Sequence, residues 1–174
     1  VTEGGSVLPV ASETIYVTKY GNDITGDGSF DNPYASLAKA INTANGLATS
    51  SNPITIEIST GVYVENNSAG PLAITANGIS IVGASRNGVL IIPNTPINNF
   101  ITVNNPILVA DITFQSPAPL ATGITLSAGS LSAFENVRIF NFLIGLDCIG
   151  APNNSYGFNS CTFIANATAM NVNS

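Results

Sequence analysis

Short segments in which apolar and polar positions alternate recur along the second half of the chain. One series consists of residues 79–81, 112–114, 137–139 and 161–163, and the other of residues 101–103, 124–126, 146–148 and 170–172. A period of two predicts β-strands with one face on a core. The first two segments of the first series are 33 residues apart. All the other intervals in both series are 22 to 25 residues. Two interleaved strand series with one period predict a parallel β-solenoid, whose turns bury their apolar faces by stacking.

Stacking in such a coil places equivalent side chains above one another, about 4.8 Å apart. The first series predicts an inward column of Ile112, Val137 and Cys161 and an outward column of Ser80, Thr113, Arg138 and Thr162. The second predicts an outward column of Thr102, Thr125, Asp147 and Asn171. Small polar residues precede three strands of the first series, namely Asp111, Asn136 and Ser160. Such residues satisfy nearby backbone groups, so we expect a bend there.

The composition supports an all-β domain. Only 8% of the residues are charged, whereas 22 of the 174 are asparagine. Asparagine, serine and threonine favour turns and stacked strands over helices. One core is expected at this length, and no linker divides the chain. We therefore predict a tail at residues 1–13 and a single β-helix domain at 14–174, with an N-terminal cap at 14–53 and coils at 54–174.

The charge pattern excludes two classes of partner. The net charge is −6, and four basic residues are present: Lys19, Lys39, Arg86 and Arg138. Binding to nucleic acid or to an anionic membrane surface needs clustered lysine and arginine. No apolar run approaches the roughly 20 residues of a membrane-spanning helix. We expect neither a nucleic-acid partner nor membrane insertion.

The first third of the chain has a different pattern. A strand at 15–17 and a turn-rich loop at 21–28 precede Leu37, Ile41 and Ala44, whose spacing predicts a helix with a stop at Asn45-Gly46. Strands at 54–58 and 61–65 follow. This opening, YVTKYGNDITGDGSFDNPYASLAKAI followed by ITIEISTGVYVEN, resembles right-handed parallel β-helix proteins of the pectin-lyase-like superfamily. The Asn- and Thr-rich texture most resembles the non-catalytic β-helix proteins of giant DNA viruses and phage spikes.

The resemblance implies a strand and a short helix that cover the first coil, and it implies several possible activities. Lyases of the superfamily hold calcium with acidic groups and use an arginine or lysine as base, and its hydrolases use an aspartate cluster. Neither constellation can be placed in this sequence. Short β-helices of viral spikes are commonly trimers, so the resemblance also favours a homotrimer.

Asp23, Asp27 and Asp31 recur every four residues in a glycine-rich segment, which is a weak signal for calcium. The alternating ligand spacing of an EF-hand is absent. We favour a structural turn without a cofactor, with a calcium site as the alternative.

The candidates for catalysis are few. The chain has no histidine, which removes serine–histidine and cysteine–histidine chemistry. Asp111 and Glu135 lie about one turn apart, and coil stacking could bring them to the separation of about 5 Å that retaining glycosidases use. Arg138 lies three residues beyond Glu135. We favour a bend for Asp111 and a surface ion pair between Glu135 and Arg138, with a catalytic role as the alternative.

The cysteines and aromatic residues give two further expectations. Cys148 and Cys161 occupy inward positions, which predicts buried free thiols, with a disulfide across the coil as the alternative. The chain has no tryptophan, so the candidates for a sugar-binding platform are Tyr20, Tyr34 and Tyr156. Loop packing is the expected role of these tyrosines.

The repeat ends at residues 170–172 without a capping segment, and an open solenoid end exposes strand edges. We therefore expect a longer natural chain or an oligomer that buries this end. The sequence favours a non-catalytic structural or attachment module of a virion or extracellular surface, with itself and a glycan as partners. The alternative is a polysaccharide lyase or glycoside hydrolase of the pectin-lyase-like superfamily.

Overall fold

Residues 13–127, 131–149 and 155–173 of the chain are described by a computed structural model, which is built from three parallel sheets. Sheet A contains, in spatial order, β1 (Glu13–Val17), β2 (Ile54–Ile58), β5 (Ile79–Gly83), β8 (Ile107–Ala110), β11 (Ser132–Glu135) and β14 (Tyr156–Asn159). Sheet B contains β3 (Gly61–Glu65), β6 (Val89–Pro93), β9 (Thr113–Gln115), β12 (Arg138–Phe140) and β15 (Thr162–Ile164). Sheet C contains β4 (Leu72–Ile74), β7 (Ile101–Val103), β10 (Thr122–Ser127), β13 (Ile144–Ile149) and β16 (Thr168–Asn173).

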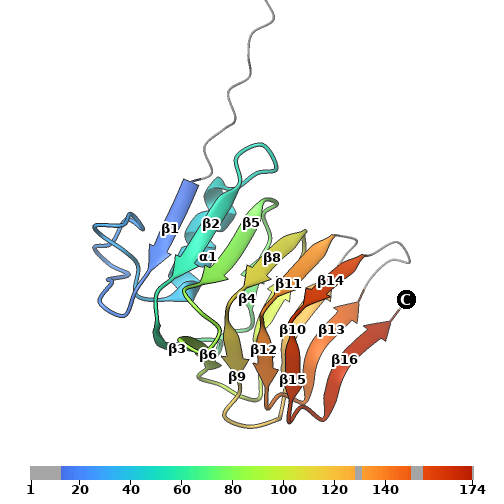
Figure 1. Ribbon diagram of the computed structural model, residues 1–174. Helices are drawn as coiled ribbons and strands as arrows, with labels where there is room; N and C mark the ends of the chain where they lie inside the picture. The colour runs from blue at the N-terminus through green and yellow to red at the C-terminus, as the bar shows by residue number, and fades with distance from the viewer. Residues whose placement is uncertain (1–12, 128–130, 150–154, 174) are drawn as a thin grey trace, which may run out of the picture.

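Each coil takes one strand from sheet A, one from sheet B and one from sheet C, and every strand pairs in parallel with the equivalent strand of the next coil. Figure 1 shows the coils following one another from β1 to β16 along one axis. The predicted all-β parallel β-helix is therefore confirmed.

The helix α1 (Leu37–Leu47) covers the start of the solenoid. Its N-cap Ser36 accepts a hydrogen bond from the Lys39 amide, and its buried face consists of Leu37, Ala40, Ile41 and Ala44. The helix continues past the predicted stop to Leu47, and the Asn45 side chain bonds outward, donating to the Ala73 carbonyl and accepting from the Thr75 amide. No helix within the described ranges is long and apolar enough to cross a membrane.

The predicted side-chain columns are confirmed, with one exception. Thr102, Thr125, Asp147 and Asn171 are in register across β7, β10, β13 and β16, and Thr113, Arg138 and Thr162 are in register across β9, β12 and β15. The assignment of Ser80 to the column of Thr113 was wrong, because β5 belongs to sheet A, where Ser80 pairs with Leu108. The interval of 33 residues joined strands of two different sheets.

The corner between sheets A and B is the predicted bend. Asp111, Asn136 and Ser160 have φ angles of 58°, 53° and 56°, in the left-handed region. Backbone hydrogen bonds link successive corners, from the Asp111 amide to the Glu135 carbonyl and from the Asn136 amide to the Asn159 carbonyl. Small polar residues tolerate this conformation better than most, which explains their recurrence.

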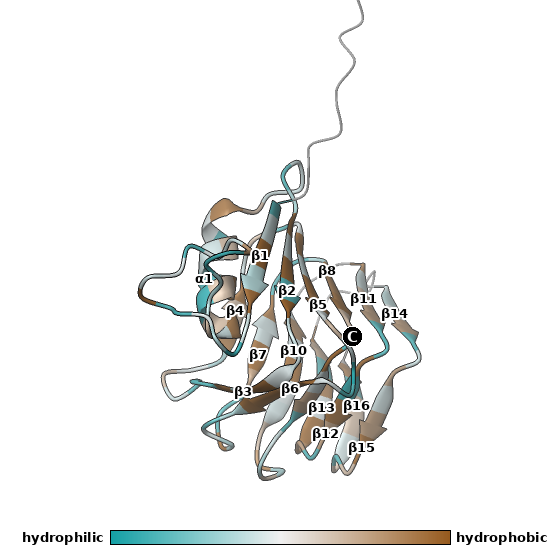
Figure 2. Cartoon of the chain, turned by 60° about the vertical axis from the view of Figure 1, so that its left-hand side comes forward, coloured by the Kyte–Doolittle hydropathy of each residue, from teal (hydrophilic) through white to brown (hydrophobic). Residues whose placement is uncertain are grey.

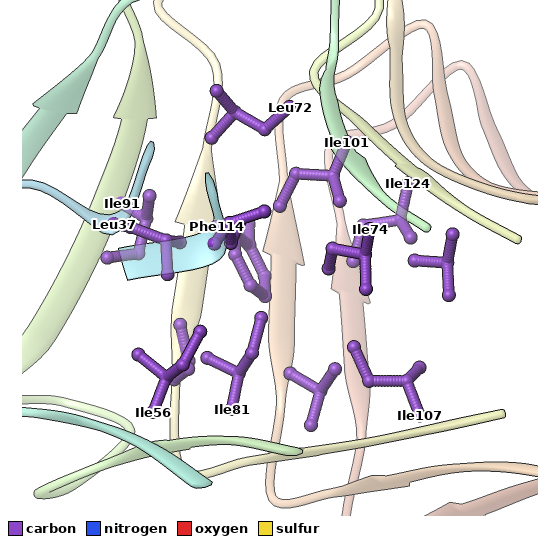
Figure 3. Packing of buried hydrophobic residues seen from close by; sticks show 14 of the residues in the cluster. Leu37, Ile56, Leu72, Ile74, Ile81, Ile91, Ile101, Ile107, Phe114 and Ile124 are labelled. Carbon is purple, nitrogen blue, oxygen red and sulfur yellow. The ribbon is translucent and has the colours of Figure 1, made fainter. Parts of the chain in front are cut away.

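The core lies between the three sheets. Figure 3 shows Ile56 and Ile81 side by side, and Ile74, Ile101 and Ile124 near one another. Phe100 adds aromatic contacts, with ring centroids 6.3 Å from Phe142 and 6.4 Å from Phe114. Figure 2 shows hydrophobic and hydrophilic residues alternating along the strands, as expected for one buried and one outer face.

Both cysteines are free thiols, as predicted. Cys148 is buried, and burial with the neighbouring Asp147 charge raises the pKa of its thiol to about 11. Cys161 is half-buried and donates to the Phe134 carbonyl at 3.2 Å. The thiols therefore act as small core side chains.

Candidate functional site

A groove of about 600 Å³ lies on the outer face of sheet A, at the end of the solenoid that contains β1. Its floor includes Tyr16, Glu57 and Val82, which are in register across β1, β2 and β5 and alternate with buried neighbours. Its wall is the loop of residues 18–33, which contributes Lys19, Tyr20 and Phe30 among others. We call this feature the aromatic groove.

The wall is held to the sheet by backbone bonds. The Tyr16 amide donates to the Gly28 carbonyl at 2.8 Å, and the Tyr34 amide donates to the Tyr16 carbonyl at 2.9 Å. A Cβ atom at Gly21 would overlap the Tyr34 carbonyl, so only glycine permits this close approach. The loop is thus an ordered wall of the groove.

Aromatic rings dominate the exposed part of the groove. Tyr20 is 98% exposed and Phe30 is 76% exposed. The rings of Tyr16 and Phe30 pack edge to face at 5.4 Å, which fixes their orientation. Exposed apolar rings gathered in one groove are a candidate feature of a ligand site.

Two charged groups face the same region. Glu57 is exposed on the floor, and Lys19 places its Nζ 5.1 Å from the centre of the Tyr63 ring. A cation over an aromatic ring is attracted by the negative face of the ring, which restrains the Lys19 side chain. The groove therefore combines apolar ring faces with one anionic and one cationic hydrogen-bonding group.

The predicted calcium residues do not converge on one point. Asp23 accepts hydrogen bonds from the amides of Ala35 and Ser36 and from the Ser36 hydroxyl. Asp27 accepts from the Ser29 amide, and hydrogen bonds from Ser29 lower the pKa of its carboxyl. Among the residues that the structure describes, no three histidine, cysteine, aspartate or glutamate side chains are placed to share a metal ion. Two of the three carboxylates thus organise the loop, and a calcium site remains a prediction.

The catalytic candidates lie on the corner between sheets A and B. Asp111 is in the bend and accepts a hydrogen bond from the Asn136 amide group at 2.6 Å. Glu135 is exposed and pairs in register with Ala110 rather than with Asp111. Within the described part of the chain Glu135 and Arg138 form no ion pair, so that expectation was wrong. A catalytic role for the three residues remains a prediction.

Glu65 is a buried carboxylate that the sequence analysis missed. Its oxygens accept hydrogen bonds from the amides of Leu37 at 2.8 Å and Ala38 at 3.0 Å, at the N-terminus of α1. Burial raises the pKa of this carboxyl, although these two hydrogen bonds oppose the shift. The available signal was the alternation in β3, which places Glu65 on the same inward face as Tyr63.

The aromatic candidates have three different positions. Tyr20 is a groove residue, whereas Tyr34 is buried, and the half-buried Tyr156 packs against the core. Phe30 was not predicted, because a single phenylalanine in a polar loop carries no periodic signal. Only contact with Tyr16 across the folded loop reveals it.

Comparisons with known proteins support the fold. No protein-family model matches the sequence, and no curated protein matches it either. Among solved structures, a mutant pectin methylesterase in complex with a hexasaccharide is 19% identical, with a TM-score of 0.59, and the match covers 87% of this chain and 49% of that one. Pectin methylesterase PemA from Erwinia chrysanthemi is 18% identical, with a TM-score of 0.56 and coverage of 87% and 54%.

A rhamnogalacturonan lyase is also similar, at 12% identity, with a TM-score of 0.50 and coverage of 87% and 51%. The chain thus spans about half the length of these proteins. The likeness confirms the right-handed parallel β-helix fold. It does not support the narrower resemblance to viral and phage-spike proteins.

Proposed function

We propose that this chain is a polysaccharide-binding β-helix domain that holds a glycan in the aromatic groove. The observation that carries the proposal is the packed pair of Tyr16 and Phe30, with the exposed ring of Tyr20 and the charged groups of Glu57 and Lys19 in the same groove. Sugar rings present apolar C–H faces and hydroxyl edges, so they match a site that has both aromatic faces and charged hydrogen-bonding groups. Ligand sites generally combine a mostly apolar lining with a few polar groups that set orientation.

The proposal is tested by measuring the affinity of the full chain for a broad panel of neutral and acidic oligosaccharides. We expect at least one glycan to bind and the Tyr20→Ala/Phe30→Ala double variant to bind it at least tenfold more weakly. The matched control is Leu120→Ala, which truncates another exposed apolar side chain in a loop outside the groove. Equal binding by the double variant and the control would contradict the proposal, as would failure of the folded chain to bind any glycan.

Turnover of the bound polysaccharide is the second candidate function, and the likeness to pectin-degrading enzymes favours it over a viral structural role. Reducing ends, unsaturated uronates and released methanol would report hydrolysis, elimination and ester cleavage, each measured with and without calcium. If Asp111 and Glu135 form the site, replacing both with alanine abolishes the product while binding in the groove is retained. If Glu57 takes part in the reaction, Glu57→Gln abolishes the product instead.

We also propose that the domain forms the homotrimer that the resemblance favours, and that it belongs to a virion or extracellular surface as expected above. Light scattering of the purified chain measures the first.

A further inference from the structure

A second feature of the surface involves both arginines of the chain. The loop between β5 and β6 folds over the outer face of sheet B, where the Thr113 hydroxyl donates to the Arg86 carbonyl at 2.7 Å. Thr113 is therefore only 7% exposed although it points away from the core. The backbone of Arg86 is thus fixed above the coil that contains β9.

The side chain of Arg86 runs along the solenoid axis from this point. Its Nη1 donates to the Ser160 carbonyl at 3.1 Å, beside β15, which is three coils beyond β6 and two beyond β9. Thr113, Arg138 and Thr162 are consecutive members of one outward column, and Ser160 lies just before Thr162. To reach Ser160, the side chain of Arg86 must cross the intervening coil, which carries Arg138. The fold thereby brings two of the four basic residues to one place.

Neither guanidinium has an anionic partner within the described part of the chain. The Nε atoms of Arg86 and Arg138 are both buried without a hydrogen-bond partner. The corner carboxylate Asp111 accepts a hydrogen bond from the Asn136 side chain and forms no ion pair with either arginine within the described residues. Two unpaired like charges repel, and buried guanidinium nitrogens normally have an acceptor. An oxyanion bound at the Nη groups would supply the negative charge that both guanidinium groups lack.

We propose that Arg86 and Arg138 form a binding site for an oxyanion group on the outer face of sheet B. A guanidinium presents its donors as a rigid fork that matches a carboxylate, sulfate or phosphate. Packing and the bond to Ser160 hold the fork of Arg86 in place before a ligand arrives. The site stands independently of the aromatic groove, whose lining contains neither arginine.

The test is a titration of the ¹⁵N-labelled full chain followed by NMR, using sodium sulfate, sodium phosphate and sodium acetate, each against sodium chloride at equal ionic strength. We expect saturable shifts of the Nε–Hε signals of Arg86 and Arg138 with at least one oxyanion. Stronger binding of sulfate or phosphate than acetate would identify a tetrahedral group, and the reverse order a carboxylate. Linear shifts that chloride reproduces would overturn the proposal.

Arg138→Thr is the decisive variant, because threonine already occupies the equivalent positions 113 and 162 and suits the outer face of a strand. We expect it to weaken oxyanion binding at least tenfold, measured at the Arg86 signal. Lys39→Gln is the matched control, since it removes one positive charge from α1, and it should leave the affinity unchanged. If Arg138→Thr behaves like Lys39→Gln, the two arginines do not form a joint site.

Discussion

The two ends of the solenoid have the same sequence pattern but very different burial. In the first coil, Ile54, Ile56 and Ile58 are almost completely buried. In the last, the strands β14, β15 and β16 contain mostly exposed or half-buried residues. One column of sheet C makes the contrast plain: Cys148 is 1% exposed, whereas Val172, its register partner, is 62% exposed. An apolar position in a strand is thus buried only when another layer covers it.

The cover at the first coil is α1, and polar contacts hold it there. Asp23 bonds to the amides of Ala35 and Ser36 just before the helix, and Glu65 bonds to the first two helical amides. At the last coil an aromatic contact joins β14 to β11, with the ring of Phe158 stacked on that of Phe134 at 5.5 Å between centroids. Figure 1 shows α1 beside β1 and β2, and among the residues that the structure describes no helix lies beside β16. The difference predicts that stability falls from the first coil to the last.

The largest expected effect comes from truncating equivalent phenylalanines in one inward column of sheet B. Phe114 and Phe163 are both in register with Ile139, but Phe114 is fully buried and Phe163 only partly. Phe114→Ala should lower the free energy of unfolding by about 3–5 kcal/mol, since it leaves a cavity in a packed core. Phe163→Ala should cost about half as much. Urea unfolding followed by circular dichroism measures both, and equal losses would show that the last coil packs as tightly as the middle.

Periodicity predicted much of this architecture and little of the site. Stacked strands repeat their apolar positions, so the columns of sheets B and C, the corner residues and α1 could be derived from spacing alone. Sheet A was only partly found, because strands such as Ser132–Glu135 contain few large aliphatic residues. The aromatic groove was missed apart from Tyr20, because the approach of the loop to β1 depends on tertiary contacts such as that of Gly21 with Tyr34. Spacing records what repeats, whereas the groove and the polar contacts that hold α1 in place occur once.

An intermediate effect is expected at the cap. Glu65→Gln should lower the free energy of unfolding by about 1–3 kcal/mol. The NH₂ group of glutamine would face one of the two backbone N–H donors of α1, and that hydrogen bond would be lost. Glu65 has a raised pKa in the folded protein, so its protonated form is favoured by folding. Its contribution is therefore full below the ordinary pKa of about 4.3 and declines as pH rises through the folded pKa.

This pH dependence separates Glu65 from the other carboxyl groups. The stability difference between wild type and Glu65→Gln should shrink as pH increases from about 4, since glutamine does not titrate. Urea titrations of both proteins at several pH values measure the difference. A gap that widens with pH would show that the hydrogen bonds to Leu37 and Ala38 outweigh burial at this carboxyl.

The smallest expected effect compares two coils at the corner between sheets B and C. Asn141 and Ala165 come directly after Phe140 and Ile164, which pair in register, and they have φ angles of 61° and 54°. Ala165→Gly should stabilise the protein by about 0.5–1 kcal/mol, because glycine adopts the left-handed region without a Cβ clash. Asn141→Gly should give no such gain, since it also removes the bond from the Asn141 amide group to the Ser116 carbonyl. A rise in Tm for Ala165→Gly alone would show that the last coil keeps the left-handed corner of the coil before it, despite its exposed strands. A fall in Tm would show that the last coil does not keep this corner, because it lacks the covered core of the earlier coils.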